Sequence, residues 1–78
     1  MNEDVVIQET FYLCKNGYFL TKEMLRKEDN IMGIIRQAIR NLGDDPEWHY
    51  STTSEPKYTG ICSTVEEAVE KVEQLVGY

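Results

Sequence analysis

The sequence predicts an α+β, two-layer fold in which two helices cover one face of a four-stranded, mostly antiparallel sheet, in the order ββαββα. Three observations support this prediction. Segments rich in β-branched and aromatic residues alternate with segments of helical periodicity. An Asn-Gly pair separates the first two strand-like segments. Each helical segment ends at a glycine. With 78 residues, the chain is expected to form a single small globular domain over residues 1–78.

The first hairpin is predicted from residues 5–14 and 18–22, which have strand-like composition. The Asn16-Gly17 pair between them favours a type I′ turn, in which both central residues have positive φ. A two-residue loop at this pair would place Leu13 opposite Leu20.

The first helix is predicted to begin at Asp29 or Asn30, either of which can cap it, and to end at Gly43. Pro46 prevents its continuation. Its apolar stripe would consist of Ile31, Ile34, Ile35, Ala38 and Leu42.

Two further strands are expected at residues 48–51 and 57–62, and a second helix follows them. Ser63 or Thr64 would cap this helix, and Gly77 would end it. Its apolar residues fall within an arc of about 120°, the width of a face packed on a core. These residues are Val65, Ala68, Val69, Val72, Leu75 and Val76.

The charge balance limits the classes of partner. Asp and Glu outnumber Lys and Arg by 14 to 8, which gives a net charge of −6. Direct binding to nucleic acid is disfavoured because phosphate contacts require excess Lys and Arg. A basic protein partner is favoured instead. The acidic start and the lack of a long apolar run indicate a cytoplasmic protein that does not contact a membrane.

Residues with catalytic or metal-binding chemistry are few. Cys14, Cys62 and His49 are isolated in the sequence and cannot by themselves form a closed zinc site. We therefore expect no enzyme activity, no cofactor and no metal site. A cysteine nucleophile activated by His49 is the remaining enzymatic alternative. A disulfide would require the strands that carry the two cysteines to be neighbours.

The outer side of the last helix is the first candidate surface. Glu66, Glu70 and Glu73 lie on one side of it at helical spacing. The acidic turn residues Asp44, Asp45 and Glu47 would extend this surface if the turn lies nearby. Such a surface favours an inhibitor that mimics the charge of DNA and occupies a basic nucleic-acid-binding protein, as small acidic proteins of viruses and mobile elements do by analogy. The alternative is a solvated helix face that maintains solubility.

The sheet face without helices is the second candidate surface. Exposed aromatic side chains there would mark an interface, and a homodimer is the default. The residues expected on it are Tyr12, Phe19, Trp48 and Tyr50. This alternative predicts a small structural or regulatory subunit that dimerises through an aromatic sheet face. If residues 23–30 instead folded over this face, they would bury it and no interface would be available.

Overall fold

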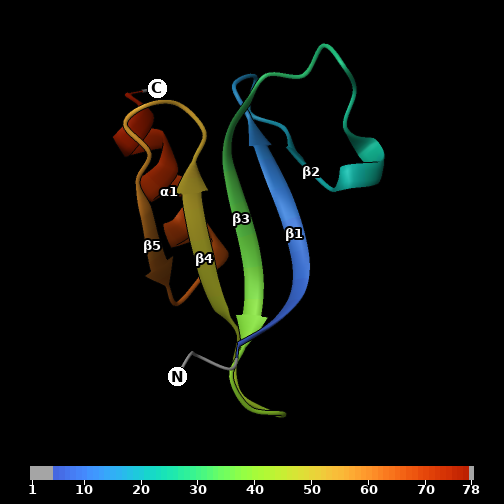
Figure 1. The fold of residues 1–78 in the computed structure, drawn as a ribbon, viewed down its shortest axis with the longest axis vertical. Helices are drawn as coiled ribbons and strands as arrows, with labels where there is room; N and C mark the ends of the chain where they lie inside the picture. The colour runs from blue at the N-terminus through green and yellow to red at the C-terminus, as the bar shows by residue number, and fades with distance from the viewer. Residues whose placement is uncertain (1–4, 78) are drawn as a thin grey trace.

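One antiparallel five-stranded sheet and one C-terminal helix form the fold in a computed structural model that describes residues 5–77 (Figure 1). The elements are β1 (Val6–Cys14), β2 (Phe19–Leu20), a short 3₁₀ helix η1 (Lys22–Met24), β3 (Ile31–Ile39), β4 (Glu47–Thr52), β5 (Thr59–Cys62) and α1 (Val65–Val76). The strand order across the sheet is β2-β1-β3-β4-β5, and every neighbouring pair is antiparallel. The predicted α+β class is therefore confirmed.

The prediction of four strands and two helices is wrong, because residues 31–39 form the central strand β3. This strand pairs with β1 on one side and with β4 on the other. Most of its residues are apolar, on both faces of the sheet, and such a run matches a helical stripe as well as a buried strand. Its isoleucines are β-branched and favour the strand. Leu42, which the helix would have buried, lies in the β3–β4 turn and is 95% exposed.

The first hairpin forms, but its turn differs from the predicted type I′ turn. Gly17 has a φ of +93°, whereas Asn16 does not have a positive φ. The Gly17 N–H donates to the Cys14 carbonyl over 2.9 Å, and Asn16 Oδ1 accepts from the Tyr18 N–H over 3.1 Å. The loop thus contains one residue more than the predicted two, which changes the register. Leu13 lies opposite Phe19 rather than opposite Leu20.

Helix α1 begins and ends as the sequence predicts. Thr64 is the N-cap, and its side chain accepts a hydrogen bond from the Glu67 N–H at 3.2 Å. The Glu67 carboxylate in turn accepts from the Ser63 N–H at 3.3 Å. At the other end, Gly77 adopts the left-handed conformation with a φ of 80°, and its N–H donates to the Glu73 and Gln74 carbonyls. The capping residues in the sequence are therefore sufficient to predict where this helix begins and ends.

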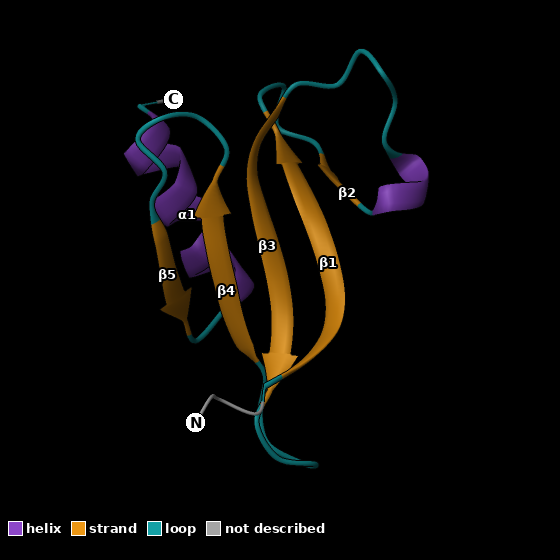
Figure 2. Ribbon diagram, in the orientation of Figure 1, coloured by secondary structure: helices purple, strands orange, loops and turns teal. Residues whose placement is uncertain are grey.

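The core lies between α1 and the β3, β4 and β5 strands (Figure 2). Leu13, Met32 and Val72 form its fully buried centre. Tyr50, Val69 and Val76 are partly buried and pack against that centre. Because the valines of α1 are mediocre helix formers, the helix depends on this packing.

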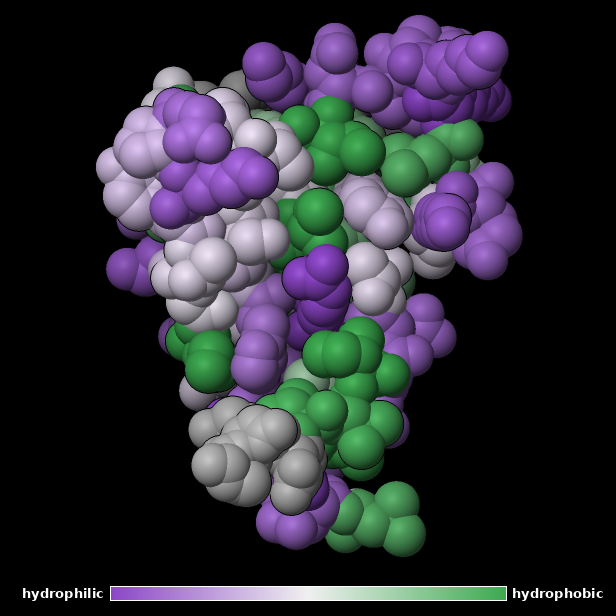
Figure 3. All heavy atoms as spheres, in the orientation of Figure 1, coloured by the Kyte–Doolittle hydropathy of each residue, from purple (hydrophilic) through white to green (hydrophobic). Residues whose placement is uncertain are grey.

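Strand register assigns side chains to the two faces of the sheet, because successive residues of a strand alternate between faces. The face under α1 includes Phe11, Leu13, Phe19, Ile35, Trp48 and Tyr50. The opposite face includes Ile7, Tyr12, Ile34, Arg36, His49 and Ile61. Figure 3 shows this second face, on which hydrophobic and hydrophilic side chains are interspersed. We call it the open face.

The N-cap is expected to stabilise the fold measurably. Thr64→Ala removes the acceptor of the Glu67 N–H and should lower the free energy of unfolding by about 1 kcal/mol. Ser63→Ala is the matched control, because Ser63 takes part through its backbone N–H alone. Urea denaturation of both variants tests the assignment. An equal loss in the two variants would contradict it.

Candidate functional site: the acidic face of helix α1

Four glutamates cover the outer side of α1, and we call them the acidic ridge: Glu66, Glu67, Glu70 and Glu73. They face outward because the apolar stripe of the helix is occupied by packing on the sheet. Glu73 is half-buried, and the other three side chains are exposed. Among residues 5–77, no ion pair neutralises any member of the ridge.

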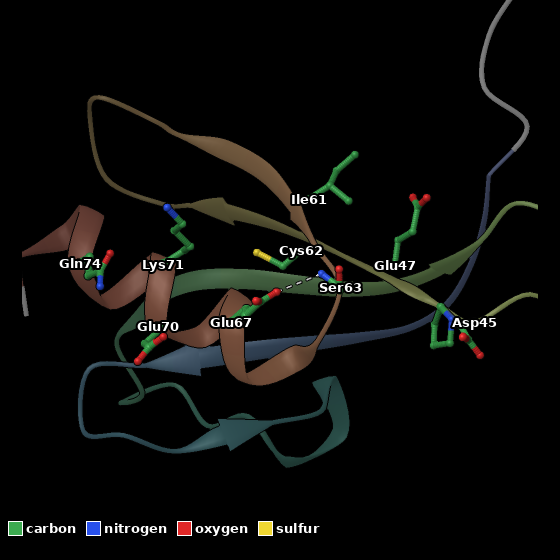
Figure 4. Close-up of a pocket in the computed structure, with 10 residues that line it drawn as sticks. Asp45, Glu47, Ile61, Cys62, Ser63, Glu67, Glu70, Lys71 and Gln74 are labelled. Carbon is green, nitrogen blue, oxygen red and sulfur yellow. Dashed lines mark hydrogen bonds between the residues drawn. The ribbon is translucent and has the colours of Figure 1, made fainter.

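Of the three acidic residues predicted to extend the ridge (Asp44, Asp45 and Glu47), only some lie near it. Asp45 and Glu47 line a groove of about 770 Å³ together with Glu67 and Glu70 of the ridge (Figure 4). In this view the Glu47 side chain points away from the helix. Asp44 does not line the groove, and its carboxylate accepts a hydrogen bond from the Asn41 side chain at 3.2 Å.

Glu47 is also neutralised by its neighbours. Its carboxylate accepts from Arg40 Nε at 2.9 Å and lies 3.0 Å from His49 Nε2. The hydrogen bond from Arg40, and secondly that from His49, lower the pKa of Glu47 below its ordinary value. A carboxylate whose charge is already balanced by an arginine attracts an external cation only weakly. Glu47 therefore contributes less to the acidic surface than Asp45.

The lowered pKa of Glu47 has a defined effect on stability. Because the folded-state pKa lies below the unfolded-state value, the pair stabilises the fold above the unfolded pKa. This contribution disappears as the pH falls through the folded pKa. Arg40→Met should raise the pKa of Glu47, as measured by an NMR titration of its carboxyl carbon. Arg26→Met, at an exposed arginine in a distant loop, should leave it unchanged, and a shift in both variants would contradict the assignment.

The cysteines and the histidine do not form a nucleophilic site. Cys62 lies on the β4–β5 half of the sheet opposite Trp48, whereas His49 points to the open face. Burial raises the pKa of the Cys62 thiol, as does the charge of Glu67, against the opposing effect of Lys71. A raised pKa reduces the thiolate fraction on which nucleophilicity depends.

The two thiols are also not linked to each other. Burial, and secondly the charge of Asp29, raise the pKa of the Cys14 thiol. Two strands separate the strands that carry Cys14 and Cys62, and both thiols are free. Within residues 5–77, no group of three or more His, Cys, Asp or Glu side chains is arranged to hold a metal ion.

The four aromatic residues expected on one dimer face are divided between the two faces. Tyr12 lies on the open face, opposite Leu20 and Ile34. Phe19 and Trp48 both contact Phe11 under α1, with ring centroids 4.9 Å and 6.3 Å from that of Phe11. The ring of the fourth residue, Tyr50, packs over Gly60 and against the core. The predicted aromatic surface is therefore not assembled in this chain.

Sequence reasoning missed a second groove, which has an apolar floor. It measures about 450 Å³ and lies on the flank of α1 that faces β2. Phe19, Val65 and Val69 supply its apolar surface, and the acidic ridge supplies its charged surface. The signal for it was the register of the first hairpin, because a shift of one residue moves Phe19 to the helix side of the sheet.

Comparison of the chain with protein-family models, with curated proteins and with solved structures finds no match. Within residues 5–77, no helix has the length and apolar character that crossing a membrane requires. The functional argument therefore depends on the surfaces described above.

Proposed function

We propose that this protein is a non-enzymatic interaction module that binds a basic protein partner through the acidic ridge. In its most specific form, the ridge mimics the charge of DNA and occupies the nucleic-acid site of a DNA-binding protein. The observation that supports this proposal is the set of outward glutamates without ion-pair partners in the described chain. Lys71 stands at i+4 from Glu67, whereas Glu66, Glu70 and Glu73 have no Lys or Arg three or four residues away on the helix.

The spacing of the charges fits a phosphate-binding site. Glu66, Glu70 and Glu73 span seven residue steps of α1, which is about 10 Å at roughly 1.5 Å per residue. The two axial intervals between these charges are about 6 Å and about 4.5 Å, which is wider than the roughly 3.4 Å per phosphate of one DNA strand but of the same order. The long side chains of Lys and Arg residues that contact phosphates can reach carboxylates at these wider intervals.

The net charge of the whole chain supports the same partner. A charge of −6 on 78 residues attracts a basic surface from a distance and accelerates association at low ionic strength. Binding of this kind weakens as salt is added, because exposed charges are screened within about 8 Å at physiological ionic strength. Strong salt dependence is therefore a necessary property of the proposed complex.

The test compares the wild type with the triple variant Glu66→Gln, Glu70→Gln, Glu73→Gln as immobilised baits in a lysate of the source cells. We expect the wild type to retain a basic protein that is eluted both by salt and by duplex DNA. The triple variant should lose most of this retention. Equal retention by both baits, or a retained protein that DNA does not displace, would refute charge mimicry.

A matched control variant separates the effect of the ridge on retention from the effect of the net charge of the protein. Glu23, Glu28 and Glu55 are exposed, lie in loops or in η1, and line neither of the two grooves beside the ridge. Their simultaneous change to glutamine alters the net charge by the same amount as the ridge variant does. Retention should survive in this control. Loss of retention in both variants would show that net charge, and not the ridge, holds the partner.

The open face supports a second candidate function, a structural or regulatory subunit that self-associates. Ile7 and Ile61 on this face remain 45% and 55% exposed, and Tyr12 on the same face is half-buried. Sedimentation of the wild type and of Ile61→Glu tests this candidate. A wild-type dimer that the variant converts to a monomer would support it, and a wild-type monomer would remove it.

A further inference from the structure

The groove beside α1 lies where a second helix would cover a five-stranded sheet. Helix α1 packs on β3, β4 and β5, and Figure 2 shows β1 and β2 to one side of it. Neighbouring strands are about 4.8 Å apart, so the two spacings from β3 to β2 cover about 10 Å. A helix with its side chains is about 10–12 Å wide. The uncovered half of this sheet face therefore has the width of one helix.

The floor of the groove is apolar and held in place. Phe19 of β2 is 36% exposed, and its ring stacks on Phe11 at 4.9 Å with an interplanar angle of 19°. Val65 and Val69 form the opposite wall. Val69 also packs against the core, so this wall is part of the rigid body of the domain. An apolar side chain that entered here would meet preformed surface on both sides.

Every charged residue that lines the groove is a glutamate: the four members of the acidic ridge. The groove on the β5 flank of α1 differs, because Lys71 lines it beside the carboxylates. Apolar floor and acidic rim together specify an occupant that is apolar on one side and basic at its margins. A second copy of this chain does not fit, because α1, the one α-helix among residues 5–77, is itself acidic. An anionic lipid surface would be repelled.

We propose that this groove receives a basic amphipathic helix of the partner protein, laid alongside α1 over β1 and β2. Apolar residues of that helix at i, i+3 and i+4 contact Phe19, Val65 and Val69, and its flanking Lys or Arg side chains pair with the ridge. This inference rests on the proposed function, since it assumes a basic partner. It adds an apolar anchor, which charge mimicry alone does not require.

The experiment uses two peptides of identical leucine and lysine composition. One places leucine at helical spacing and forms an amphipathic helix, and the other has a scrambled order. Binding of each labelled peptide to the full chain is measured by fluorescence anisotropy. The wild type should bind the amphipathic peptide at least about tenfold more tightly than the scrambled one, the effect of one well-buried apolar contact.

The variant Phe19→Glu makes the protein more acidic while removing the apolar floor, so the two hypotheses predict opposite results. Pure charge attraction would strengthen the binding of both peptides. The groove instead predicts that the preference for the amphipathic peptide falls to nearly none. Leu42→Glu adds the same charge at a side chain that is 95% exposed in the β3–β4 turn, and should keep the preference. Phe19→Ser removes the ring without adding charge. It replaces Phe19→Glu in this test if Phe19→Glu does not fold.

The outcomes separate the two proposals. An unchanged preference in both Phe19 variants, or equal binding of the two peptides by the wild type, would overturn the groove inference. The proposed function would survive that result if the triple glutamine variant of the ridge weakened both peptides. Failure of the wild type to bind either peptide at low salt would overturn both proposals.

Discussion

Ile35→Ala is expected to lower the free energy of unfolding by about 2–5 kcal/mol. Ile35 is fully buried in the central strand β3, where it pairs with Phe11 of β1 and Tyr50 of β4. Removal of its side chain leaves a cavity between the sheet and α1. A chain of this size has a total stability of only roughly 4–12 kcal/mol, so the variant should lie close to the unfolding threshold. Urea denaturation measures the loss.

Leu42→Ala is the matched control, because it separates the strand from the helix that the sequence suggests. In a helix over residues 30–42, Leu42 would share the buried stripe with Ile35, and both substitutions would be costly. In the structure Leu42 is 95% exposed, and its loss should change stability by less than about 0.5 kcal/mol. Comparable losses in the two variants would contradict the assignment of β3.

Gly33→Ala is expected to destabilise the fold by about 1–3 kcal/mol, although alanine normally stabilises a strand relative to glycine. Gly33 does not have a positive φ, so its backbone conformation tolerates a side chain. The obstacle is contact with α1, because a Cβ atom at this position would lie 2.6 Å from Val72 Cγ1 and 3.3 Å from the Ser51 carbonyl oxygen. A helical valine is nearly confined to one rotamer and cannot turn aside. The helix must therefore move away from the sheet.

Shortening the opposing side chain provides the control for this prediction. In a Val72→Ala background the closest methyl group is absent, and Gly33→Ala should become nearly neutral or stabilising. A double-mutant cycle measures the interaction between the two positions. If Gly33→Ala cost the same in both backgrounds, the close approach of β3 to α1 would not be the cause.

The parts of the fold that the sequence predicts correctly depend on local signals. Thr64 and Gly77 mark the ends of α1 through hydrogen bonds to residues a few positions away, so these contacts can be inferred from the local sequence. The outward position of the ridge follows from the same helix. The β3 strand could not be predicted in this way. Its identity depends on pairing with β1 and β4, and only tertiary structure specifies those partners.

The aromatic residues show how one residue of register changes a functional prediction. A turn one residue longer than expected moves Phe19 from the open face to the face under α1. For Trp48 and Tyr50, alternation along β4 fixes only that they share a face opposite to that of His49. Contacts with Phe11 and with the core decide which face it is. The aromatic dimer surface could not be tested before those contacts were known.

The central claim is that the protein binds a basic partner through the outer side of α1 and the groove beside it. The most direct test is a titration of the isotope-labelled protein with the basic amphipathic peptide, followed by amide NMR shifts. We expect the largest shifts at Glu66, Val69 and Glu70 of α1 and at Phe19 of β2, with reduced shifts at higher salt. Shifts confined to the open face, for example at Ile34 and Ser51, with α1 unaffected, would contradict the claim.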